Sequence, residues 1–191
     1  RNNKLTIFKA ITSSQSVDQL LRAHHITSMT NVAVHGEKAR RSIAWLQDYL
    51  ENVGRPIGSF GPEISESPCY PESACMTLGS RRVSSDFLWR LTTIERIERT
   101  VSFPKEKFYA CELGSGSANL MRVLKMMHMQ MTGVLIDLPE TLAIAHANLI
   151  SSFPDANILY LTDVHTEYDF AEYDFVLVPT AFREVISALK F

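Results

Sequence analysis

From Phe108 onward, short apolar runs alternate with stretches of helical length, and this alternation restricts the fold more than any other feature. The four runs are Phe108–Leu113, Gly133–Ile136, Ile158–Leu161 and Phe175–Val178. Ala118–Met131 and Pro139–Ser152 separate the first three runs and are long enough to be helices. Strands that alternate with helices form right-handed βαβ units, whose parallel strands lie beneath covering helices. The sequence therefore predicts an α/β fold with a parallel sheet and helices on both of its faces.

Residues 1–53 are expected to form an N-terminal helical segment ahead of the sheet. Ser16–Gln19 has the S-x-x-Q form of a capping box, which marks the start of a helix. In a second helix, apolar residues recur at three- and four-residue steps from Ala39 to Val53, and Gly54 is placed to end it.

Residues 54–104 are expected to form a loop followed by a helix. Gly54–Arg82 contains half of the eight glycines and half of the eight prolines, so it cannot be one long regular element. A loop of this length is either functional or a linker, so an ordered cap or substrate loop and a mobile linker both stay open. Ser84 or Ser85 is suited to cap the helix that follows.

The composition excludes several classes of partner. The 191 residues include 19 Lys and Arg against 21 Asp and Glu, a formal net charge of −2, so counterion release cannot drive broad nucleic-acid binding. No apolar run approaches the ~20 residues of a membrane span, and the polar start is not a signal peptide. We therefore expect a cytoplasmic protein with no nucleic-acid or membrane partner, and leave a homo-oligomer open.

Cysteine, histidine and methionine predict no special chemistry. The six histidines have no paired spacing with cysteines or carboxylates, so no metal site is expected. Cys111 lies in an apolar run and is expected to be buried, while a Cys69–Cys75 disulfide is left open. Met127 and Met131 are expected to pack in the core.

The strongest chemical motif is the run Glu112–Leu120, which ends a predicted strand and opens a helix. Gly114 permits a sharp turn, and Gly116 allows the backbone to approach a ligand closely. About twenty residues further on, the next strand ends in Asp137, where a carboxylate can accept both hydroxyls of a ribose. Together these features predict a nucleoside-binding half-sheet.

The spacing also indicates which nucleoside. A dinucleotide fingerprint G-x-G-x-x-G/A needs Gly or Ala at position 119, where this chain has Asn119. The pattern E/D-x-G-x-G-x-G fits Glu112, Gly114 and Gly116, with the small Ala118 in place of the third glycine.

This pattern resembles that of the class I S-adenosylmethionine-dependent methyltransferases, and the chain is similar in particular to the sugar O-methyltransferase family. The similarity is carried by Ser84–Ile97, Glu112–Leu120, Val134–Ala143, Phe153–Asp155 and Tyr173–Pro179. It covers about residues 54–182 and implies a Rossmann-like domain at 105–191 with S-adenosyl-L-methionine as cofactor. It also implies methyl transfer to a hydroxyl oxygen of a small-molecule or glycan acceptor, expected to be a sugar.

The same resemblance implies roles for individual residues. Those implied to bind the cofactor are Glu112, Gly114, Ser115 and Gly116 beside its methionine part, Asp137 and the adjoining Leu138 at its ribose, and Asp163 (or its neighbour Thr162) near its adenine. For Glu112 and Asp137 a helix-terminus or solvated carboxylate is the alternative.

No catalytic residue can be assigned from the sequence. A sugar hydroxyl needs a general base, and the candidates Asp163, His165 and Glu184 are equally well explained as surface residues. Arg81, Arg82 and Arg90 are candidates for holding a cofactor carboxylate or a sugar phosphate, with surface solvation as the alternative.

The chain opens with Arg1 and ends soon after the fourth apolar run, so we expect a fragment that lacks the C-terminal half of the sheet. Phe175–Val178 would then be an apolar open edge if nothing covers it. Two other functions stay open, namely an NAD-linked oxidoreductase and a non-catalytic interaction module that retains the loop.

Overall fold

The computed structural model describes residues 36–53, 55–70, 72, 75–163 and 168–183. Its elements, in chain order, are α4 (Gly36–Val53), η1 (Ile57–Phe60), β1 (Met76–Leu78), β2 (Arg81–Val83), α5 (Ser85–Thr100), β3 (Phe108–Leu113), α6 (Asn119–Met127), β4 (Met131–Asp137), α7 (Pro139–Ser152), β5 (Ile158–Tyr160), η3 (Phe170–Glu172) and β6 (Phe175–Pro179). The predicted capping box at Ser16–Gln19 lies outside the described residues. None of the described helices is long and apolar enough to cross a bilayer.

Within the described residues, the predicted helices and strands are present, and one helix is shorter than predicted. Ser84 is the N-cap of α5, because its hydroxyl accepts the backbone N–H of Phe87 at 3.1 Å. Pro139 occupies the first turn of α7, where its missing N–H costs nothing. Helix α6 ends at Met127, earlier than the predicted Met131, because Met131 already belongs to β4.

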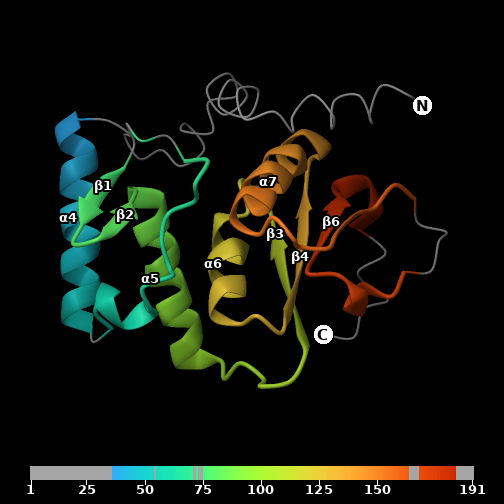
Figure 1. Cartoon of the computed structure of the whole chain (residues 1–191), viewed down its shortest axis with the longest axis horizontal. Helices are drawn as coiled ribbons and strands as arrows, with labels where there is room; N and C mark the ends of the chain where they lie inside the picture. The colour runs from blue at the N-terminus through green and yellow to red at the C-terminus, as the bar shows by residue number, and fades with distance from the viewer. Residues whose placement is uncertain (1–35, 54, 71, 73–74, 164–167, 184–191) are drawn as a thin grey trace.

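Four parallel strands form the sheet, in the order β3-β4-β6-β5. The predicted parallel α/β sheet is therefore confirmed, and it is compatible with a Rossmann-like fold. The order nevertheless differs from that of an open dinucleotide-binding sheet, whose first strand lies between its second and fourth strands. Here β4 lies between β3 and β6, and β3 is an edge strand of the sheet that the described residues form (Figure 1).

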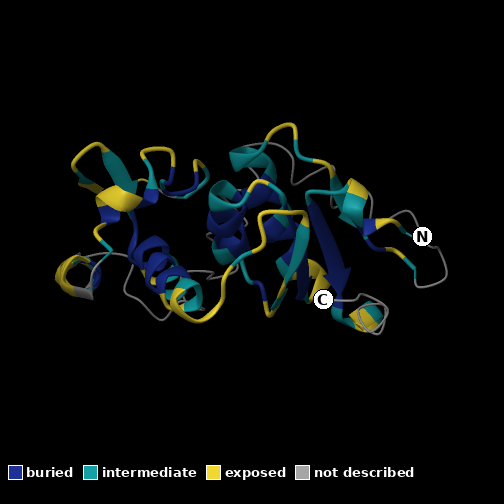
Figure 2. Cartoon of the chain, turned by 90° about the horizontal axis from the view of Figure 1, so that it is seen from below, coloured by how far each residue is buried: buried dark blue, intermediate teal, exposed yellow. Residues whose placement is uncertain are grey.

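The two faces of the sheet are covered differently. Leu135, Phe175 and Leu177 pack with α6 and α7, which lie side by side on the same face. On the other face, Val134 and Val176 pack with Phe170 of η3, a short helix in the connection between β5 and β6. In the described residues, the long helices therefore cover one face, and the expected long helices on the second face are replaced by η3 and its flanking residues. Figure 2 shows the buried residues gathered in the sheet and in the helices beside it.

Exposure in the sheet settles one conditional expectation, for β6, and contradicts another, for Cys111. Strand β6 is not an open edge, because it pairs with both β4 and β5 and its residues are all buried. Cys111 is exposed, and Leu113 on the same side of β3 is 77% exposed, because no described residue packs over that part of the face.

Residues 55–70 pack against the rest of the structure and are fastened by arginines. The guanidinium of Arg81 donates to the carbonyls of Ile57 and Gly61, the latter at 2.6 Å. Arg82 donates to the carbonyl oxygens of Ser67 and Tyr70. Arg81 and Arg82 thus bind this chain's own backbone, which is a structural role rather than the ligand contact considered from the sequence.

The remaining cysteines and methionines also have structural surroundings. Cys69 and Cys75 are both free thiols, so the disulfide left open does not form; instead Sγ of Cys69 lies 2.8 Å from Oγ of Ser151 on α7. Met131 is fully buried and Met127 packs against the same cluster, as predicted.

Candidate functional site

The turn between β3 and α6 has an unusual backbone. Gly114, Gly116 and Ala118 all have positive φ, at 75°, 55° and 61°. This region is accessible to glycine and costly for other residues. A Cβ built at Gly114 or Gly116 would meet nothing within 4 Å. The glycines are therefore needed for the backbone conformation, and the space beside them is open.

Asp137 at the end of β4 lies against this turn. The register pairs Leu113 with Ile136, so the two strand ends come together. Oδ2 of Asp137 accepts the backbone N–H of Gly116 at 2.8 Å, and Oδ1 accepts the N–H of Leu138 at 2.7 Å. The predicted pairing of turn and acid is thus present, and the 56% exposed Leu138 adds an apolar surface beside it.

Glu112 lies on the side of β3 that faces α5 and α6. Burial raises the pKa of its carboxyl group to about 7. Arg90 and the N–H of Met121 oppose this rise, whereas the negative charges of Asp86 and Asp137 add to it. This carboxyl group is therefore close to half-ionised at neutral pH.

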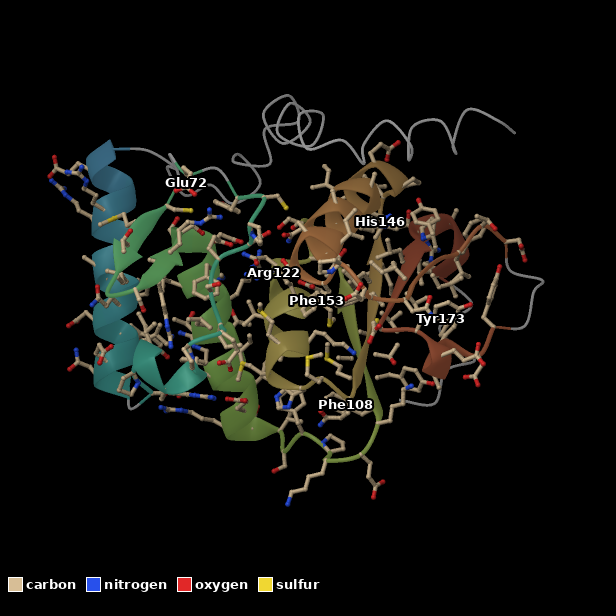
Figure 3. All side chains as sticks on the ribbon, in the orientation of Figure 1. Glu72, Phe108, Arg122, His146, Phe153 and Tyr173 are labelled. Atoms are coloured by element: carbon tan, nitrogen blue, oxygen red, sulfur yellow. The ribbon has the colours of Figure 1, made fainter. Side chains whose placement is uncertain are left out.

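A buried polar cluster joins α5 and α6 to the segment that contains Ser65. Asp86 on α5 accepts from Nδ2 of Asn119 at 2.8 Å and lies 3.1 Å from Nη2 of Arg90. Oδ1 of Asn119 accepts from Nε of Arg122, which also donates to the carbonyl of Ser65. Figure 3 shows Arg122 beside α6, where it reaches the segment that contains Ser65.

Sequence reasoning missed the roles of Asp86, Asn119 and Arg122. Asp86 and Arg90 are four residues apart in the predicted helix, a spacing that brings opposite charges together. The ion pair between Asp86 and Arg90 could therefore have been predicted from the sequence. The contact of Asp86 with Asn119 joins residues 33 positions apart, and only the fold brings it about.

Three buried polar atoms at the site have no hydrogen-bond partner among the described residues. They are Oε2 of Glu112, Oγ of Ser115 and Nε of Arg90. Buried polar groups are nearly always paired, so unpaired ones need a reason. An acceptor, a hydroxyl and a cationic donor left free beside one turn are suited to a polar ligand.

The adenine side of the predicted site is less well supported. Asp163 follows β5, and β6 separates β5 from β4. The residue paired with Asp137 is Pro179 of β6. Asp163 therefore follows a strand that does not pair with β4, and its adenine role stays a prediction. His165 and Glu184 lie outside the described residues.

In the described part of the chain, no three His, Cys, Asp or Glu side chains are grouped to hold a metal ion. Comparison of the chain with known protein families, with curated proteins and with solved structures finds no match.

Proposed function

We propose that this chain binds S-adenosylmethionine at the turn after β3 and transfers its methyl group to a hydroxyl oxygen, expected to be that of a sugar. The observation that carries the proposal is the hydrogen bond from the Gly116 N–H to the carboxylate of Asp137. In dinucleotide sites, the backbone N–H groups at this position receive a pyrophosphate. Here a carboxylate already occupies one of them.

Charge then distinguishes the two kinds of cofactor. Like charges 4 Å apart repel by roughly 4 kcal/mol near a protein surface, so a pyrophosphate beside Asp137 is disfavoured. The carboxyl groups of Asp86 and Asp137 both act on that of Glu112, and Arg90 is the cation that acts on it. A ligand that carries a sulfonium and an ammonium group is attracted to such a site.

The unpaired groups fit the parts of this cofactor. Oε2 of Glu112 is free to accept from an ammonium group, and Nε of Arg90 is free to donate to a carboxylate. Asp137 uses one hydrogen bond at each oxygen, so each retains a lone pair for a ribose hydroxyl. The exposed side chain of Leu138 offers an apolar contact for the base.

The bound cofactor supplies an activated methyl group with a good leaving group. What this chain contributes is orientation, through the fixed turn and its carboxylates, and exclusion of water from the reacting atoms. The choice of a sugar as acceptor rests on the resemblance carried by Val134–Ala143 and the other matching segments.

Thermal unfolding with added ligand tests the proposal. S-adenosylmethionine or S-adenosylhomocysteine at about a hundredfold its Kd adds roughly 2.7 kcal/mol of stability, and we expect this shift for the wild-type chain and not for Gly116→Val. A shift with NAD alone supports the oxidoreductase alternative. No shift with either ligand supports the non-catalytic module and contradicts the proposal.

A further inference from the structure

Asp86 and Arg90 form an ion pair on α5, and the charges of both act on Glu112. They lie one turn apart on α5, with Nη2 of Arg90 3.1 Å from Oδ1 of Asp86. The second oxygen of Asp86 accepts from Nδ2 of Asn119 on α6 at 2.8 Å. Asp86 is 4% exposed and Asn119 is 2% exposed, so neither side chain can turn away into solvent.

Asn119 is itself held in place. Its Oδ1 accepts from Nε of Arg122 at 2.9 Å, and Nη2 of Arg122 donates to the carbonyl of Ser65 at 2.8 Å. Because each amide or guanidinium group is fixed by its next neighbour, the pair keeps one geometry relative to the first turns of α6. Within the described residues, Oε2 of Glu112 and Nε of Arg90 nevertheless stay unpaired.

We propose that Asp86 and Arg90 are positioning residues that set the charge on Glu112 and, through it, the affinity of the turn for a cationic ligand. The second half of this inference rests on the proposed function; the first half concerns the ligand-free chain alone. In this arrangement Glu112 binds a cation as a carboxylate and releases it when protonated, so ligand binding strengthens as the pH rises.

The charged and titratable groups around Glu112 come from three directions. Asp86 and Arg90 face it from α5, Asp137 from the end of β4, and Cys111 precedes it on β3. From α6 it receives the backbone N–H of Met121, which carries no titratable proton. Asp86 and Asp137 favour the protonated form, whereas Arg90 and Met121 favour the carboxylate.

Two neutralising substitutions should therefore act in opposite directions. Arg90→Gln removes a positive charge and should raise the pH at which Glu112 titrates by about one unit. Asp86→Asn keeps an acceptor for Asn119, removes a negative charge and should lower that pH by a similar amount. Arg90→Lys keeps the positive charge and should titrate close to the wild type, which a purely structural role for Arg90 would not produce.

The titration can be followed without any ligand, by carbon NMR of glutamate labelled at the side-chain carboxyl, with Glu112→Gln to assign the signal. Opposite shifts for Arg90→Gln and Asp86→Asn support the inference; an unchanged midpoint, or shifts of one sign, overturn it. Should Asp86→Asn fail to fold, the contrast between Arg90→Gln and Arg90→Lys decides the same question.

Calorimetric titration of S-adenosylmethionine then tests the consequence for binding. We expect affinity to rise about tenfold between pH 6 and pH 8, because the ionised fraction of a group that titrates near pH 7 rises by that factor, and to show no such rise in Glu112→Gln. Binding without this pH dependence overturns the inference. Opposite NMR shifts with no binding at any pH retain the charge-setting pair and refute the proposed function.

Discussion

The N–H of Gly116 and the carboxylate of Asp137 are joined by a 2.8 Å hydrogen bond between the turn after β3 and the end of β4. The residues are 21 positions apart, and the parallel register of the two strands brings them together. This bond fixes the turn in the conformation that leaves the Cβ sides of Gly114 and Gly116 open. Substitutions at Asp137 and Gly116 should therefore change the stability of the turn.

Replacement of Asp137 by alanine removes the acceptor of two backbone N–H groups. We expect a loss of about 1–2 kcal/mol in the free energy of unfolding, measured by chemical denaturation, and at least a tenfold loss in affinity for S-adenosylmethionine. Asp155→Ala, at an exposed position after α7, is the control and should change neither quantity. Equal effects of the two substitutions would contradict the role given to Asp137.

Gly116→Ala tests the backbone requirement separately from packing. The new Cβ meets no atom within 4 Å, so its cost comes from the φ of +55° alone, about 1 kcal/mol. Gly58 also has open space around it but has no positive φ, so Gly58→Ala should leave the free energy of unfolding nearly unchanged. If both variants unfold at the same denaturant concentration, the turn does not require glycine.

Gly133 has the opposite reason for being glycine. A Cβ there would lie 2.7 Å from Cγ of Met121 and 3.0 Å from Cδ1 of Phe175, where α6 packs on the sheet. Gly133→Ala should therefore destabilise the chain by about 1–3 kcal/mol. A double-mutant cycle with Met121→Ala should show that part of this loss is recovered; strictly additive losses would contradict the contact.

Arg122→Met should be the most destabilising of these substitutions. It leaves the fully buried carboxyl group of Glu66, whose pKa is raised by burial, without its nearby guanidinium. Breaking a buried pair in this way costs about 3–5 kcal/mol. The double variant Glu66→Gln/Arg122→Met should lose less than Arg122→Met alone, since no charge is stranded; the reverse order in denaturation experiments would refute this explanation.

The stability of the chain should fall as pH rises through the range in which Glu112 titrates. Its pKa is about 7 in the fold against 4.5 as the ordinary value, so the folded chain binds more protons between these values than the unfolded chain does. The contribution of Glu112 to the free energy of unfolding is fully present below about pH 4.5. It is lost as the pH rises to 7 and above, by up to about 3 kcal/mol. When the free energy of unfolding is measured across this pH range, Glu112→Gln should lack the decrease. If the variant and the wild type show the same pH dependence, Glu112 is not the group responsible.

Much of the local structure was predictable from the sequence. Ser84 and the apolar residues after it define α5, and the alternation of runs after Phe108 places β3, β4, β5 and β6 to within two residues. The turn at Gly114 and Gly116 and the carboxylate at Asp137 were also found, because glycine spacing and a strand-terminal acid are local signals. Whether these residues bind the cofactor is still a prediction.

Other features were decided by contacts between distant residues. Arg81 and Arg82 looked suited to a ligand and instead hold the backbone of residues 57–70, since the carbonyl groups that they meet come from a segment whose path the sequence did not reveal. Cys111 was expected to be buried because its strand is apolar, yet exposure depends on what packs over the strand.

The sequence by itself determined the α/β class, the positions of the four sheet strands and the glycine turn, because each depends on the conformational preferences and periodicity of neighbouring residues. Only the tertiary structure decided that β6 lies beside β4 and that the charges of Asp86, Arg90 and Asp137 act on Glu112. Strand pairing and electrostatic coupling depend on distance in space, so the charge of Glu112 depends on residues brought near by the fold rather than by the chain.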